Sequence, residues 1–143
     1  MDHMRLEMRV SVITLAVPDV TAAVRFYRQA FGWEPDFVAE GEVAFYDMGG
    51  IVLSLWSGLA RELGRELPPP GAVTLAYNTR SPQEVDAVFA QALAAGATVA
   101  SPARTQEWGG YSGHIADPHG HLWEIAYNPD WPLDEEGRVR PEW

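Results

Sequence analysis

The sequence predicts an α+β fold built from two similar modules. Segments rich in β-branched residues with alternating polarity, which are typical of strands, are followed by segments whose apolar residues recur at helical spacing. The order strand, helix and further strands then occurs a second time. An internal repeat within 143 residues implies two modules packed about a pseudo-twofold axis.

The first module begins with a strand and a helix. Residues 11–17, SVITLAV, alternate in polarity and predict a strand. Asp19 is a suitable N-cap for the following helix, whose apolar side chains recur every three or four residues until Gly32 ends it. Residues 42–56 then predict two strands joined by a turn at 48–50, where two glycines follow a methionine.

The second module repeats this order. Residues 71–77 predict a strand, and residues 81–84, Ser-Pro-Gln-Glu, have the form of a capping box with proline at the first helical position. An apolar stripe continues the helix until Gly96. A short strand at 97–100 and a hairpin over 111–127 complete the module.

The two copies can be aligned by short identical pieces. Leu15-Ala16 matches Leu75-Ala76, and the turn at 47–50 matches the turn at 117–120. The predicted organisation is a first module at 9–57, a linker with one helical turn at 58–70, a second module at 71–128 and a polar tail at 129–143.

Composition and charge exclude several classes of function. The net charge of −10 argues against nucleic acid and anionic membranes as partners, because both require a basic surface. The absence of cysteine rules out disulfides, thiolate nucleophiles and cysteine-ligated zinc. No apolar run is long enough to span a membrane and the first residues do not form a signal peptide, so a cytoplasmic protein is expected.

Alternation along the strands separates two kinds of face. One face of each strand carries large apolar side chains, which we expect beneath the helices. The other face carries mostly small side chains, which leave room for a cavity; the alternative is that it packs against a partner subunit or the other module. This second face is predicted to contain Val12, Thr14, Ala16, Val52, Ser54, Trp56, Ala72, Thr74, Ala76, Leu122, Glu124 and Ala126.

Glu124 is the unusual member of this face. It interrupts an apolar strand, and by repeat symmetry it lies opposite Ser54. A carboxylate in such a place is costly unless it is paired, metal-bound or protonated. The alternative is a glutamate at the rim of the cavity, in contact with water.

The runs VITLAVPDV and DPHGHLWEIA resemble the vicinal oxygen chelate superfamily, which includes glyoxalase I, extradiol dioxygenases, fosfomycin-resistance proteins and bleomycin-binding proteins. The resemblance covers about residues 9–129. It implies two βαβββ modules that form a cupped, open eight-stranded mixed sheet, commonly in a homodimer.

The resemblance also implies where a metal would be bound. In the metal-dependent members the ligands come from four positions, which fall here at Val12, Ser54, Ala72 and Glu124. Only Glu124 is of ligand type, and a divalent ion needs several nitrogen or oxygen donors. No cofactor is therefore expected and a divalent metal is disfavoured. His114, on the neighbouring strand, is a further candidate donor, or else a half-exposed strand residue.

Aromatic residues indicate the kind of ligand. Trp56 ends its strand on the small-residue face, Trp108 lies in a glycine-bearing loop, and Tyr111 follows that loop. Aromatic walls with one acid suit a planar or cationic organic molecule. The predicted binding residues are Thr14, Ser54, Trp56, Thr74, Trp108, Tyr111, His114, Leu122 and Glu124.

Three functions remain open from the sequence. The first is a metal-independent small-molecule binder, as the bleomycin-binding branch implies. The second is a lyase, isomerase or dioxygenase, in which Glu124 is a metal ligand or a general base. The third is an interaction module without a ligand, which leaves the inward Glu124 unexplained.

Overall fold

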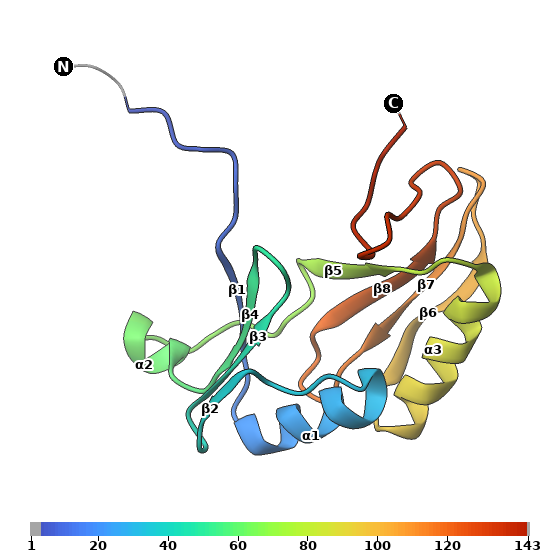
Figure 1. The fold of residues 1–143 in the computed structure, drawn as a ribbon. Helices are drawn as coiled ribbons and strands as arrows, with labels where there is room; N and C mark the ends of the chain where they lie inside the picture. The colour runs from blue at the N-terminus through green and yellow to red at the C-terminus, as the bar shows by residue number, and fades with distance from the viewer. Residues whose placement is uncertain (1–3, 143) are drawn as a thin grey trace. The chain divides into compact units, whose positions relative to one another are not determined.

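The structure is a computed structural model that describes residues 4–142, so Trp143, the last residue of the predicted tail, lies outside the described residues. The strands form two four-stranded sheets (Figure 1). The chain divides into two compact units, one comprising the residues up to Val24 together with Glu34–Arg65, the other comprising Arg25–Trp33 and the residues from Glu66 onwards. The helix α1 (Val20–Phe31) is thus shared between them.

The sheet of the first unit has the strand order β1-β4-β3-β2. β1 and β4 are parallel, and the other neighbours are antiparallel. The strands are β1 (Val12–Ala16), β2 (Phe37–Ala39), β3 (Val43–Asp47) and β4 (Val52–Trp56). A short helix, α2 (Leu59–Leu63), follows in the predicted linker.

One face of this sheet is buried, as the alternation predicts. Leu15, Leu53 and Leu55 lie on it and are almost inaccessible to solvent. Asp19 starts α1, since its Oδ1 accepts a hydrogen bond from the Ala22 N–H at 2.9 Å. The small or polar side chains of Thr14 and Ser54 lie side by side on the opposite face.

The sheet of the second unit repeats the arrangement, with the order β5-β8-β7-β6. β5 and β8 are parallel and the other pairs are antiparallel. The strands are β5 (Thr74–Asn78), β6 (Thr98–Thr105), β7 (Tyr111–Ala116) and β8 (Leu122–Tyr127). The prediction of an α+β fold with mixed sheets is therefore confirmed, with the eight strands divided between two sheets.

The helix α3 (Pro82–Ala94) covers one face of this second sheet. It starts as the capping box predicts, because the Ser81 Oγ accepts from the Glu84 N–H at 3.2 Å. Phe89 lies close to the sheet at Gly113, where an added Cβ would lie 2.7 Å from its Cζ atom. Ile115 and Ile125 are fully buried on this side.

The strand registers correct the internal alignment. β1 residue Val12 pairs with Val52, whereas in the second unit Thr74 pairs with Leu122. The counterpart of Val12 is therefore Thr74, and the predicted match to Ala72 is wrong by two residues. The caps agree with the corrected alignment, because Asp19 and Ser81 then occupy equivalent places. Ala72 precedes β5.

None of the helices in the described part of the chain is both long and apolar enough to cross a membrane.

Candidate functional site

Glu124 lies in the middle of β8, between two neighbouring strands. Its register partners are Ala76 of β5 and His114 of β7. Directly opposite residues on antiparallel strands have Cβ atoms about 4.5–5.5 Å apart and point to the same face. The sheet therefore places the imidazole of His114 and the carboxylate of Glu124 next to each other, both partly exposed.

This pair lies on the side of the sheet that α3 does not cover. The helix packs against the face of Gly113, Ile115 and Ile125, and residues one position away along each strand point the other way. We call this other side the Glu124 face. On β5, β7 and β8 it carries Thr74, Ala76, Asn78, Ser112, His114, Ala116, Leu122, Glu124 and Ala126.

The Glu124 face combines small and polar side chains. Ala76 beside Glu124 is small and exposed, whereas Ala126 is buried, and Thr74 and Asn78 add hydrogen-bonding groups. Among residues 4–142, neither the Glu124 carboxylate nor the His114 imidazole has a hydrogen-bond or ion-pair partner. Both groups are therefore free to bind a polar or charged molecule.

A metal ion fits the chain poorly. After the register correction, the expected ligand positions in the first unit are Val12 and Ser54, which offer one hydroxyl group. Those in the second unit are Thr74 and Glu124, which offer one hydroxyl group and one carboxylate. Divalent ions need several ionised or imidazole donors. Within the described residues, no group of three or more His, Asp and Glu side chains is gathered closely enough to hold a metal. We therefore derive no step that passes through a metal.

Trp56 lies on the predicted face of the first sheet, but its indole is already bonded. Its Nε1–H donates to the Glu42 carboxylate at 3.2 Å, and the Arg61 guanidinium donates to the same oxygen at 2.8 Å. These two contacts, with Arg61 the stronger, lower the pKa of Glu42. The hydrogen bonds fix the orientation of the indole, which remains half-buried.

The structure separates Tyr111 from the Glu124 face. Tyr111 pairs with Tyr127 on the opposite side of the sheet, and its hydroxyl donates to Asp86 of α3 at 2.6 Å. This hydrogen bond raises the pKa of Tyr111. Trp108 lies over Gly110, where its ring occupies the space that a side chain would take, and it is half exposed.

A buried network that local sequence patterns do not reveal holds the β7–β8 turn. The Tyr27 hydroxyl donates to the Asp117 carboxylate at 2.5 Å and accepts from the Trp123 Nε1–H at 2.9 Å. The other oxygen of Asp117 accepts the backbone N–H groups of His119 and His121, both at 2.9 Å. Asp117 thereby joins the second half of α1 to the hairpin that carries Glu124.

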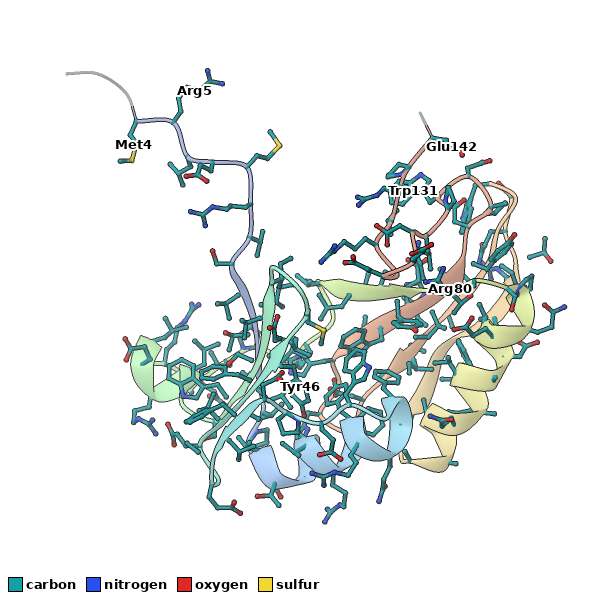
Figure 2. All side chains as sticks on the ribbon, in the orientation of Figure 1. Met4, Arg5, Tyr46, Arg80, Trp131 and Glu142 are labelled. Atoms are coloured by element: carbon teal, nitrogen blue, oxygen red, sulfur yellow. The ribbon has the colours of Figure 1, made fainter. Side chains whose placement is uncertain are left out.

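A hollow of about 210 Å³ lies at the ends of β5 and β8, where the tail returns. Arg80, which follows β5, lines this hollow, and one of its guanidinium nitrogens donates a hydrogen bond to the Asp134 carbonyl at 2.9 Å. Trp131, a residue of the tail, also lines it; both residues are labelled in Figure 2. Its lining is Thr79, Arg80, Tyr127, Asn128, Pro129, Trp131, Pro132 and Leu133. The sequence analysis missed it because the path of the tail is not set by any local pattern.

Comparison with known proteins identifies the family. A sequence profile of the Glyoxalase/Bleomycin resistance protein/Dioxygenase superfamily matches residues 9–125. An uncharacterized protein of Mycobacterium bovis is 32% identical over 123 residues, which cover 78% of each chain.

Solved structures agree with the profile. A glyoxalase-related enzyme from Fulvimarina pelagi is 41% identical, with a TM-score of 0.87 over 94% of this chain and 98% of that one. Lactoylglutathione lyase from Agrobacterium tumefaciens shares the fold at 24% identity, with a TM-score of 0.67 over 90% of this chain and 100% of that one. The chain belongs to the glyoxalase/bleomycin resistance protein/dioxygenase superfamily.

Proposed function

We propose that this protein binds a small aromatic, cationic molecule on the Glu124 face of the second sheet, without a metal ion. The observation that carries the proposal is the unpartnered Glu124 carboxylate among small side chains on the side that α3 leaves open. A carboxylate kept free of protein partners attracts a cation, and the exposed Ala76 beside it leaves room for a flat ring. His114 next to it offers a second hydrogen-bonding or stacking group.

A charge series on one ring system tests this proposal. We expect 1-methylquinolinium to bind more tightly than neutral quinoline, and quinoline-2-carboxylate to bind least, in calorimetric titrations. Glu124→Gln keeps the shape of the side chain but removes its charge, and we expect it to weaken binding of the cation at least about tenfold, equivalent to about 1.4 kcal/mol. Glu135→Gln, an exposed change in the tail, is the matched control and leaves binding unchanged.

Two results contradict the proposal. One is the absence of binding for all three compounds up to millimolar concentration. The other is equal affinity of Glu124→Gln and the unaltered protein for the cation.

The neighbouring His114 and Glu124 side chains also support an enzyme of the lyase, isomerase or dioxygenase type. Two adjacent groups that exchange protons can act as general base and general acid on one substrate. Turnover of 2-oxoaldehyde thiohemiacetals or catechols, with and without Ni, Zn, Mn or Fe, tests this second candidate. Activity that survives in Glu124→Gln removes the carboxylate from the mechanism.

We further propose that the protein acts as a homodimer. The first unit supports this, because Phe37 and Phe45 stack at 5.8 Å on the face of its sheet that also carries Ser54, and they are 53% and 36% exposed. Exposed apolar surface of this kind is typical of a protein–protein contact.

A further inference from the structure

The residues before β1 form an arm, which we define as residues 4–11; it lies outside helices and strands and bends at Met8. In Figure 1 it runs away from the first sheet, and Figure 2 marks Met4 and Arg5 at its far part. Every second residue is apolar and highly exposed: Met4 is 78%, Leu6 85%, Met8 104% and Val10 57% accessible. This alternation is the pattern of a strand with one face ready to be buried.

The arm continues the parity of β1. Along the sequence, its even-numbered residues are in phase with Val12, which is 48% exposed and lies on the same face of the first sheet as Thr14 and Ser54. Between residues 4 and 10, the only backbone–backbone hydrogen bond in the described part of the chain runs from the Arg9 N–H to the Glu7 oxygen. Such a row of unpaired backbone groups beside an edge strand is a template for pairing with another chain.

We propose that the arm straightens at Met8 and pairs antiparallel with the arm of a second copy of this chain, with Met8 opposite Met8 on the twofold axis. The inference deepens the homodimer of the proposed function by naming its interface. An isologous contact of this kind uses the same residues on both copies.

The charges of the arm select this register. With Met8 on the axis, Glu7 of each copy lies opposite Arg9 of the other, which gives two favourable cross-strand pairs. The apolar residues also match, because Leu6 then faces Val10 and Met4 faces Val12.

Other registers are worse. With Glu7 on the axis, glutamate faces glutamate and Arg5 faces Arg9, so that all the opposed charges are alike. With Leu6 on the axis, Val10 and Val12 face no residue of the described arm. A shift by one residue places apolar side chains opposite charged ones.

Charge complementarity also favours a second copy as the occupant. The arm contains two arginines and one glutamate, in a chain whose net charge is −10. Two acidic copies repel each other over most of their surfaces. In the paired arms, each copy presents a basic group to an acidic group of the other. The Glu7–Arg9 ion pair at 3.2 Å within one arm is then replaced by the same pair between the two arms.

Cysteine cross-linking tests the register, since the chain has no cysteine of its own. Opposite residues in an antiparallel pair have Cα atoms about 4.5–5.5 Å apart, within the roughly 4.4–6.8 Å of disulfides. Met8→Cys should therefore form a disulfide-linked dimer on mild oxidation. Leu6→Cys is the matched control, because its two copies would lie about 14 Å apart along the ribbon and should not cross-link at the same protein concentration.

Charge reversal provides a second, independent test by light scattering. Glu7→Arg alone and Arg9→Glu alone should each shift the protein towards monomer, because like charges then face each other. An equimolar mixture of the two variants should recover the dimer, since every opposed pair is again of opposite sign.

The outcomes separate the arm from the dimer itself. If the unaltered protein has the mass of one chain, both the homodimer and the arm pairing are wrong. If it is a dimer but Leu6→Cys cross-links as readily as Met8→Cys, or the charge variants remain dimers, only the arm pairing is wrong. Binding of 1-methylquinolinium, measured on the same samples, reports on the Glu124 face separately.

Discussion

The buried network around Tyr27 allows a sharp test of how the Glu124 hairpin is held. In Tyr27→Phe the ring remains, but the hydroxyl that joins Asp117 to Trp123 is removed. All three residues are less than 5% exposed, with Tyr27 at 0%, Trp123 at 4% and Asp117 at 4%. Water therefore cannot replace the lost hydroxyl without a rearrangement of the core.

The magnitude follows from the two lost bonds. A hydrogen bond to a charged acceptor contributes about 1.5–3 kcal/mol, and a buried donor left unsatisfied costs about 1–3 kcal/mol. Tyr27→Phe loses the first at Asp117 and creates the second at the Trp123 Nε1–H. We expect the free energy of unfolding to fall by about 3–5 kcal/mol, a large part of the roughly 5–15 kcal/mol of an ordinary protein.

Urea unfolding followed by circular dichroism measures this change, provided that the dependence on urea concentration is the same in both proteins. Tyr77→Phe is the matched control, because Tyr77 is 39% exposed and its hydroxyl has no partner among residues 4–142. We expect the control to stay within about 0.5 kcal/mol of the unaltered protein. A loss below about 1 kcal/mol for Tyr27→Phe would mean that water or another group replaces the hydroxyl, so that the network is not dry.

Three further predictions concern the rest of the molecule. Asp86 raises the pKa of Tyr111, so the stabilisation from this pair is complete below the ordinary tyrosine pKa and is lost as the pH rises through the raised value. In unfolding curves measured over a range of alkaline pH, Tyr111→Phe should not show this loss of stability. Arg61 and Trp56 lower the pKa of Glu42, so the stabilisation from these contacts is present above the ordinary glutamate pKa and is lost as the pH falls through the lowered value. Carbon NMR of the Glu42 carboxyl group should show that its pKa rises in Arg61→Ala. An unchanged titration of Glu42 would contradict the ion pair. Ser81→Ala removes the N-cap of α3 and should lower the unfolding free energy by about 0.5–2 kcal/mol, whereas Ser101→Ala on β6 serves as a control for loss of a hydroxyl outside a cap.

The parts of the fold that could be predicted depend on neighbours in sequence. The start of α3 follows from Ser81 and Glu84, which are three residues apart, and the start of α1 follows from Asp19 in the same way. The repeat was visible for a similar reason, but short identities such as Leu15-Ala16 and Leu75-Ala76 gave a wrong offset. The helix caps and the strand registers depend on hydrogen bonds. Both show that Thr74, and not Ala72, is the residue of the second unit that is equivalent to Val12.

The site could be predicted only within single strands. Alternation along β8 places Glu124 and Leu122 on the same face, as observed. The side of Tyr111 depends instead on the register of the whole hairpin, because one more or one fewer residue in the turn moves it to the other face. The contact of Tyr27 with Asp117 joins residues 90 positions apart, and no local pattern indicates it. The binding roles predicted for Thr14, Ser54 and Trp56, and the cytoplasmic location, stay predictions.

In the proposed function, the free carboxylate of Glu124 binds an organic ligand and not a metal ion. Elemental analysis of the purified protein, after incubation with Zn, Ni, Mn and Fe and removal of unbound ions, tests this claim most directly. We expect far less than one metal ion per chain, and the same low content in Glu124→Gln. One tightly retained ion per chain, lost in Glu124→Gln, would contradict it.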